Sequence, residues 1–265
     1  MPTPFLEMPN TLNNLSHEQR RPTASFIETA LPGFKRTLEA RRSIREYNGI
    51  SIPETIMKEC LHDATLTPSS SNLQTYQLYW VRDVVRKSEI ANACMQQPAA
   101  TTAGELVVVV ARGDLWRSNL NKLIEIMTEY GTRPMPDELD NYYRKIVPLL
   151  MKTDAVGYYN FLRRVTFWFK GRHQAVVRTP ISRADHRIYA HIQSSLAAQT
   201  LMLSIAAHGY ESCPIGGMDS RRISRLLSLP RKAEITMVVA AGRGTKKGLY
   251  GPRIRFADSD LIKEV

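Results

Sequence analysis

The amino-acid sequence predicts an α+β fold in which a sheet of few strands is wrapped by helices. Two continuous apolar runs, at 106–111 and 235–241, are typical of strands buried on both faces. A long helical segment precedes the second run, and its part at 196–207 is apolar nearly all round, which predicts a central, buried helix. Because helices and strands alternate, we expect one mixed sheet with helices on its faces.

The elements of the first half follow in order. Residues 1–32 are polar and interrupted by prolines, and we expect an N-terminal extension there, followed by one domain over 33–265. A helix is expected at about 34–41. Pro53 opens the next helix, since proline is favoured in a first helical turn. A strand is expected at 78–81.

The second half begins with a mostly helical region at 115–171 that is rich in aromatic residues. A further helix begins near Asp185 and ends at Gly209, a usual residue for a helix C-terminus. Residues 253–256 are a candidate for a last short strand.

Composition sets limits on the partners. The net charge is +11 and the pI is about 9.7, but the cations are scattered from Arg20 to Lys263. No zinc-finger or RNA-binding signature accompanies them, so we expect no nucleic-acid partner. No stretch reaches the roughly 18 apolar residues of a membrane span, so we expect no membrane partner.

The three cysteines predict no metal site or disulfide framework, because they are far apart and odd in number. Buried free thiols in a reducing cytoplasm are expected instead. No secretory signal is apparent at the N-terminus.

Two polar clusters are candidates for a ligand site. Arg41, Arg42, Ser43 and Arg45 place three guanidinium groups and a hydroxyl within five residues, a set suited to phosphate. A solvated helix C-terminus is the alternative. The second cluster consists of Pro68, Ser69, Ser70 and Asn72. Its hydroxyl and amide groups suit a polar, ring-bearing ligand. The alternative is a loop whose side chains cap its own backbone.

Two further segments carry similar signals. In Pro214, Ile215, Gly216 and Gly217, the adjacent glycines would let the backbone approach a ligand, unless the segment is an ordinary turn. Arg253 and Arg255 would point the same way in an extended segment, or else belong to a basic tail. The sequence contains no dinucleotide-binding or P-loop motif, and no spacing singles out a catalytic triad. If the chain is an enzyme, a bound cofactor therefore carries the chemistry.

The order of these segments resembles that of the FMN-dependent nitroreductase family. The N-terminal motif is similar to Arg-Arg-Ser-Ile-Arg-Glu-Tyr at 41–47, and the second to Pro-Ser-Ser-Ser-Asn-Leu-Gln at 68–74. The third is similar to Ser-Leu-Ala-Ala-Gln at 195–199 with Pro-Ile-Gly-Gly at 214–217. The closing segment runs from Arg255 to Val265. The stretch 114–184 corresponds to a variable helical insertion, which either forms a lid or belongs to the core.

The resemblance implies a three-layer sandwich with a mixed, mostly antiparallel sheet, and a homodimer whose C-terminal segments are exchanged. FMN would lie at the interface of the two chains. Arg41, Arg42 and Ser43 would hold its phosphate and ribityl chain, joined by Arg253 and Arg255. The partner chain would supply Pro68, Ser69, Ser70 and Asn72.

The resemblance also implies the chemistry. Residues 214–217 would line the flavin ring with the Gly216 amide near N5, and Arg45 would face the pyrimidine edge. NAD(P)H would reduce FMN, and a nitroaromatic, quinone or other electron-poor acceptor would then take the electrons in a ping-pong reaction. Enone reduction, dehalogenation and a flavin-storing or sensing protein without turnover are the alternatives. The family often places an amide before the second strand, where this chain has Gln96 and Gln97.

Overall fold

The computed structural model describes residues 24–153 and 157–265. Its centre is a four-stranded sheet in the order β1 (Tyr76–Val81), β2 (Glu105–Ala111), β4 (Glu234–Gly242) and β3 (Glu211–Ile215). All three neighbouring strand pairs are antiparallel. A parallel bridge between Ser43 and Ser212 adds the N-terminal motif to the edge of β3. The predicted mostly antiparallel sheet is confirmed.

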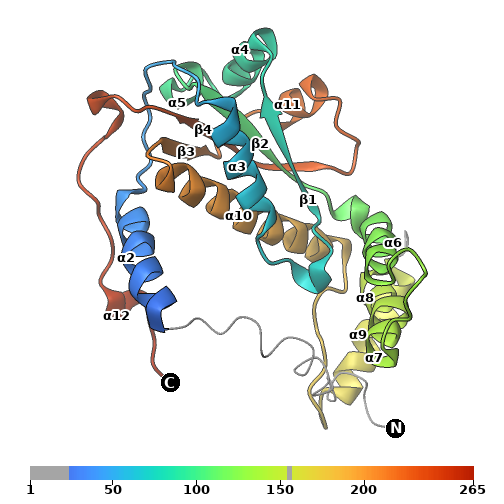
Figure 1. The fold of residues 1–265 in the computed structure, drawn as a ribbon. Helices are drawn as coiled ribbons and strands as arrows, with labels where there is room; N and C mark the ends of the chain where they lie inside the picture. Colours follow the sequence, from blue (N-terminus) through green and yellow to red (C-terminus); the bar gives the residue numbers. More distant parts are fainter. Residues whose placement is uncertain (1–23, 154–156) are drawn as a thin grey trace.

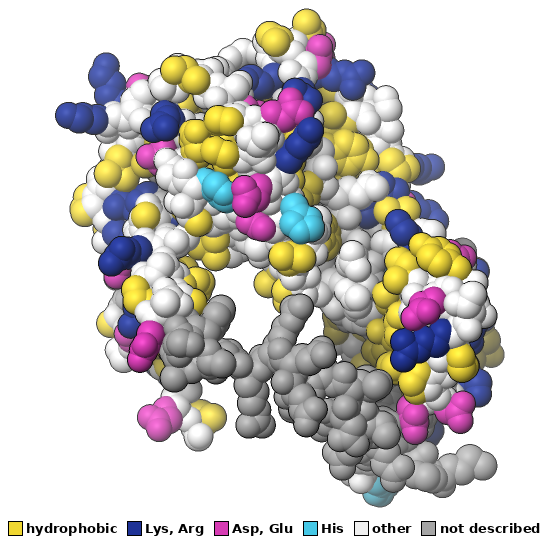
Figure 2. Space-filling model, viewed as in Figure 1, with side chains coloured by type: hydrophobic (Ala, Val, Ile, Leu, Met, Phe, Trp, Pro, Cys, Tyr) yellow, Lys and Arg dark blue, Asp and Glu magenta, His cyan; other side chains and the backbone are white. Residues whose placement is uncertain are grey.

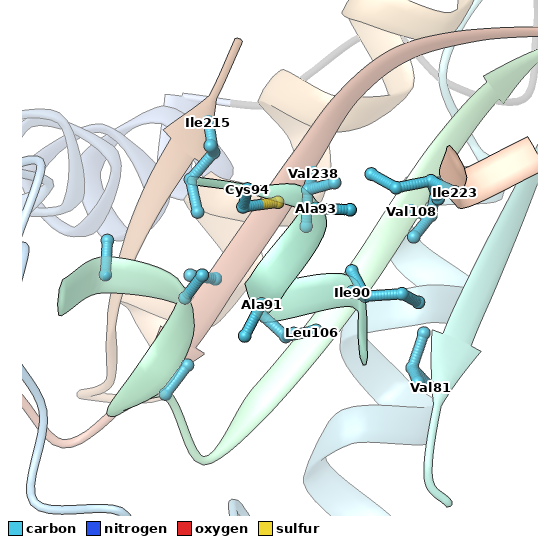
Figure 3. Close-up of a cluster of buried hydrophobic side chains, with 14 of the residues drawn as sticks. Val81, Ile90, Ala91, Ala93, Cys94, Leu106, Val108, Ile215, Ile223 and Val238 are labelled. Carbon is cyan, nitrogen blue, oxygen red and sulfur yellow. The ribbon is translucent and has the colours of Figure 1, made fainter. Parts of the chain in front are cut away.

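The sheet is the middle of three layers. On one face, Leu106, Val108 and Val110 of β2 pack with helices α4 (Val84–Ala93), α5 (Pro98–Thr101) and α11 (Ser220–Leu226) (Figure 3). On the other face, Val107 and Val109 pack with α3 (Glu54–Thr65) and α10 (Arg183–Ala207). Figure 1 shows these two helices on that face of the sheet. Every residue of β2 is buried, which confirms the prediction from its continuous apolar run.

Helix α10 crosses the whole sheet. Ser182 caps its N-terminus reciprocally with Asp185, and Gly209, with a φ of +76°, follows its end. The prediction of burial for 196–207 is confirmed for most of that part, since Ala197, Ala198, Leu201, Met202 and Ile205 are buried, but it is wrong for Leu196. With Ile188 and Ile192, Leu196 forms an exposed apolar stripe on the single chain.

The predicted helical region at 115–171 is confirmed as a group of helices beyond one end of the sheet (Figure 1). After η2 (Gly113–Leu115), this group contains α6 (Trp116–Met127), α7 (Asp137–Asn141), a π-helical turn η3 (Tyr142–Ile146), α8 (Val147–Met151) and α9 (Tyr158–Lys170).

Three parts of the structure differ from the predictions. Helix α2 (Ala24–Ala40) begins well before position 34 and contains Pro32, so part of the expected extension is helical. β3 was not predicted. The strand expected at 253–256 does not form. The segment between η4 (Lys246–Gly248) and a short helix α12 (Asp258–Leu261) runs alongside α2 (Figure 1), where none of the strands in the described residues lies next to it.

Candidate functional site

The N-terminal arginine motif follows α2 and runs along the edge of the sheet. The backbone N–H of Ile44 donates to the Ser212 carbonyl oxygen (3.3 Å), and that of Arg45 donates to Gly248 (2.8 Å). Ile44 is buried in the core. In an extended segment its neighbours Ser43 and Arg45 therefore face away from the core.

A polar cavity of about 440 Å³ lies at this motif. Its walls come from both ends of the chain, because the C-terminal segment 249–255 folds back over residues 41–45. The structure brings six of the predicted site residues together around it: Arg41, Arg42, Ser43, Arg45, Arg253 and Arg255. No acidic residue is among the described residues that line the cavity.

The charges in this cavity repel one another. Partial burial lowers the pKa of Arg41, and the positive charges of Arg253, Arg255 and Arg42 lower it further. No hydrogen-bond partner of the Arg41 guanidinium is found within the part of the chain that the structure describes. A concentration of uncompensated cations around a hydroxyl fits a phosphate group, which would satisfy both the charges and the donors.

Two of the arginines also hold the cavity together. The guanidinium of Arg253 donates to the carbonyl oxygens of Glu39 (2.6 Å) and Arg41 (2.9 Å), at the end of α2, where helical carbonyls lack partners. Arg42 donates to the carbonyl of Gly251 (2.8 Å). These bonds fix the C-terminal segment against α2, so Arg253 has a structural role that the sequence did not reveal.

Arg45 lies at the other side of the cavity. Its guanidinium stands over the ring of Tyr250, 5.1 Å from the centroid, and donates weakly to the Ser43 carbonyl oxygen (3.4 Å). Tyr250 was not among the predicted residues, and no motif in the sequence indicated it. The cation–π contact orients Arg45 while leaving it partly accessible.

Residues 214–217, the glycine loop, form the end of β3 and the two residues after it. They lie near the arginine motif because Ser43 is bridged to Ser212 of β3. Pro214, Gly216 and Gly217 are exposed, whereas the side chain of Ile215 is buried in the core. Ile215 can therefore line a ligand only through its backbone. A Cβ at Gly216 would meet no atom within 4 Å, so the space above this residue is open.

Gln97 holds the glycine loop. Its side-chain amide donates to the Gly217 carbonyl oxygen (2.7 Å) from the N-cap of α5. Gln96 turns instead to Asn92 with a left-handed backbone at φ +52°. Of the two glutamines considered from the sequence, the one in contact with the loop is Gln97.

The serine cluster forms η1 (Ser70–Asn72), an exposed loop with an unusual backbone. Ser71 and Asn72 have φ angles of +51° and +52°, a region that non-glycine residues seldom adopt. The Ser69 hydroxyl accepts a hydrogen bond from the Gln74 N–H (3.0 Å), and Ser71 bonds to the Tyr142 hydroxyl (2.8 Å). The loop caps itself in this way, yet Pro68, Ser70 and Asn72 remain exposed.

The two polar clusters do not meet within one chain. Ser70 and Ser71 line a cavity with Tyr189 and Gln193 of α10. Gln193 precedes the end of α10 at Ala207 by 14 residues, or about 21 Å of helix. The arginine cavity lies beyond that end, next to β3, and none of Pro68, Ser69, Ser70 and Asn72 lines it.

Four side chains of α10 and β4 form a series of contacts that contains the residue types of a catalytic triad. Glu234 contacts His191 Nε2 (3.2 Å), His191 Nδ1 contacts the Thr236 hydroxyl (2.9 Å), and Thr236 contacts the Ser194 hydroxyl (2.6 Å). Ser194 is fully buried, so its hydroxyl cannot reach a substrate. Arg187 and His191 lower the pKa of the Glu234 carboxyl, as in a structural ion pair.

Comparison with known proteins identifies the family of the chain. The family model described as "Nitroreductase family" matches residues 38–243. A Bacillus subtilis (strain 168) protein named as an NAD(P)H nitroreductase, YdgI, is 25% identical and covers 83% of this chain and 93% of its own. A Thermus thermophilus protein named NADH dehydrogenase is 24% identical, with 81% and 88% covered.

A solved structure supports the fold. A nitroreductase-like chain from Exiguobacterium sibiricum 255-15, crystallised in complex with FMN, superposes with a TM-score of 0.62 at 23% identity and covers 88% of this chain and 97% of its own. The family model spans well over half of the sequence, from the end of α2 to the end of β4. The chain therefore belongs to the nitroreductase family.

Proposed function

We propose that this protein transfers hydride from NAD(P)H, through FMN, to nitroaromatic, quinone or other electron-poor acceptors in a ping-pong reaction. Membership of the nitroreductase family makes it an FMN-dependent oxidoreductase with a nicotinamide donor. The observation that carries the residue assignment is the arginine cavity, in which cations from both ends of the chain surround Ser43 beside an open glycine loop.

The residues present fit FMN. Arg41, Arg42 and Arg255 would neutralise a phosphate dianion, with Arg253 holding the wall, and Ser43 would donate to the phosphate or ribityl chain. The bound flavin supplies the two-electron chemistry itself. The protein is left to bind, orient and tune that group.

Arg45 and Gly216 have the roles closest to the reaction. At the pyrimidine edge, the Arg45 guanidinium would stabilise the negative charge of the reduced flavin, which is electrostatic preorganisation. Gly216 would present its backbone N–H to flavin N5, and the open space above it admits the ring. Gln97 would position this amide through its bond to Gly217.

We propose that the complete site forms in a homodimer. The exposed Pro68, Ser70 and Asn72 loop would reach the arginine cavity of the partner chain, since the two clusters lie apart within one chain. The exposed apolar stripe of α10 at Ile188, Ile192 and Leu196 supports an interface along this helix. Exchange of the C-terminal segments remains a prediction.

The helical region 114–184 would complete the acceptor pocket as a lid. The alternative is that this region belongs to the helical core. The same scaffold also supports enone reduction, and one solved structure with this fold (TM-score 0.62, 18% identity) is described as an enone reductase. The three cysteines are buried as free thiols, which supports the cytoplasmic location that we propose.

The lysines and arginines do not favour the nucleic-acid alternative. On the face shown in Figure 2 they are scattered over several elements instead of forming one band. A flavin-storing protein without turnover is the remaining alternative from another class.

An anaerobic titration tests the proposal. The purified protein, reconstituted with FMN, should lose its flavin absorbance on addition of NADH or NADPH and regain it with a quinone or nitroaromatic compound. Parallel-line kinetics with varied donor and acceptor would support the ping-pong order. Flavin that binds but is reduced by neither nicotinamide would replace the proposal with the storage alternative.

A further inference from the structure

Helix α9 turns its apolar side outwards. Tyr158, Phe161, Leu162, Val165, Trp168 and Phe169 recur at a spacing of three and four residues and so form one stripe along about 17 Å of helix. All six are exposed; Phe161 keeps 62% and Trp168 51% of its surface accessible. A helix on a globular domain ordinarily buries such a stripe.

The opposite side of α9 attaches it to the protein, and the residue most deeply buried on this side is an arginine. Arg163 is only 8% exposed, and its guanidinium donates to the carbonyl oxygens of Pro180 (3.2 Å) and Leu150 (3.3 Å). Asn160 and Phe167 are the other partly buried members of this side. The bonds of Arg163 therefore fix the helix with its apolar stripe facing away from the chain.

Exposed cations flank the stripe. The segment 157–182 contains no Asp or Glu, and its exposed cations are Arg164, Lys170, Arg172 and Arg178, whereas Arg163 lies on the attached side. Arg172 stands 3.7 Å above the Trp168 ring, at the edge of the stripe. Arg164 is close enough to Asp185 to lower the pKa of that carboxyl, although Asp185 is already engaged in the cap of α10.

We propose that α9 docks on an anionic lipid bilayer. Aromatic and aliphatic side chains on one face and basic residues at its flanks describe a helix that lies in the interface plane, where each cation near an anionic surface contributes roughly a fivefold factor in binding. No helix within the described residues is long and apolar enough to span a membrane, but a helix lying flat needs no such length.

Charge favours lipid over a second copy of the chain as the occupant. Two α9 helices face to face would bring two sets of cations together without an acidic counterpart, whereas an anionic surface complements them. Docking would bring the enzyme to lipid-soluble acceptors such as quinones, a consequence that rests on the proposed function.

Co-sedimentation of the FMN-loaded full chain with vesicles tests the docking. The protein should pellet with vesicles that contain phosphatidylglycerol and stay in solution with pure phosphatidylcholine. The double variant Phe161→Asp/Trp168→Asp should lose at least about tenfold in partitioning, because two buried aromatic contacts are replaced by repelled charges. The matched control Val84→Asp/Val85→Asp changes two exposed apolar residues on α4 and should bind as the parent does.

Tryptophan emission gives a second readout that needs no disruptive variant. Emission of the parent should shift to the blue with anionic vesicles, and Trp168→Phe should abolish that shift. Absence of binding to anionic vesicles, or equal binding by the Phe161/Trp168 variant, would overturn the proposal. So would a change of that variant from dimer to monomer in light scattering, which would identify a second chain as the occupant. NADH-dependent flavin reduction is measured separately, so a failure of docking is distinguishable from a failure of the redox proposal.

Discussion

Replacing Arg41 by alanine removes the most crowded cation of the arginine cavity. Its guanidinium would donate a charge-assisted hydrogen bond to the FMN phosphate, and such bonds contribute about 1.5–3 kcal/mol. At about 1.4 kcal/mol per factor of ten, the Kd for FMN should rise about 10- to 150-fold. The same side chain repels Arg42, Arg253 and Arg255 in the free protein, so its removal should not lower the melting temperature of the FMN-free form.

Fluorescence quenching of FMN by the apoprotein measures this affinity, and scanning calorimetry measures the melting temperature. Arg36→Ala is the matched control, because Arg36 is an exposed arginine on the same helix α2 that does not line the cavity. The affinity of the parent should also weaken more steeply with salt than that of the Arg41 variant, since one phosphate contact has been removed. An unchanged Kd, or an equal loss in Arg36→Ala, would refute the assignment of this cavity to phosphate.

Three further outcomes follow from the structure. Arg45→Ala should retain FMN but lower its reduction potential, measured by dye equilibration, because the cation that favours the reduced anion is gone; an unchanged potential would remove Arg45 from this role. Gly248→Ala would place a Cβ 2.6 Å from the carbonyl oxygen of Glu46 and should lower the free energy of unfolding by about 1–3 kcal/mol in urea titrations. Gly216→Ala, where the Cβ meets nothing, is its control. Burial lowers the pKa of His186, so the folded state stays neutral while the unfolded state binds a proton below pH 6.5; stability should fall as pH drops from 7.5 to 5.5, and His186→Gln should flatten that slope. Identical slopes would contradict the effect of burial.

The central part of the fold could be predicted because burial leaves a local signature. The apolar runs of β2 and β4 and the apolar part of α10 at 196–207 identify those elements without knowledge of their neighbours. β3 was missed because Ser212 and Pro214 interrupt its pattern. Proline is tolerated there because β3 is an edge strand, paired only with β4 among the named strands.

Other errors have similar causes. Pro32 and Gly33 indicated a break, yet α2 continues through them. The alternation of Arg253, Ile254, Arg255 and Phe256 suggested a strand, but alternation cannot supply a neighbouring strand. In both segments, the position in the tertiary fold determines the secondary structure that forms.

The site was predictable in its charges and not in its contacts. The sequence could indicate which arginines line one cavity, because guanidinium groups close to a hydroxyl form a local pattern that suits a phosphate. The bonds of Arg253 to Glu39 and of Gln97 to Gly217 join residues 214 and 120 positions apart, and no local pattern encodes them. The separation of η1 from the arginine cavity likewise became visible only in three dimensions.

The central claim is that one flavin is bound by two chains, and subunit mixing tests it most directly. Arg41→Ala and the loop variant Ser70→Asp/Asn72→Asp should each bind FMN poorly when alone. After subunit exchange at equal amounts, half of the dimers are mixed, and each mixed dimer contains one unaltered composite site. About a quarter of all sites should therefore regain FMN, since the two sites of a symmetric dimer are equivalent. A mixture that stays as empty as its two components would contradict the account.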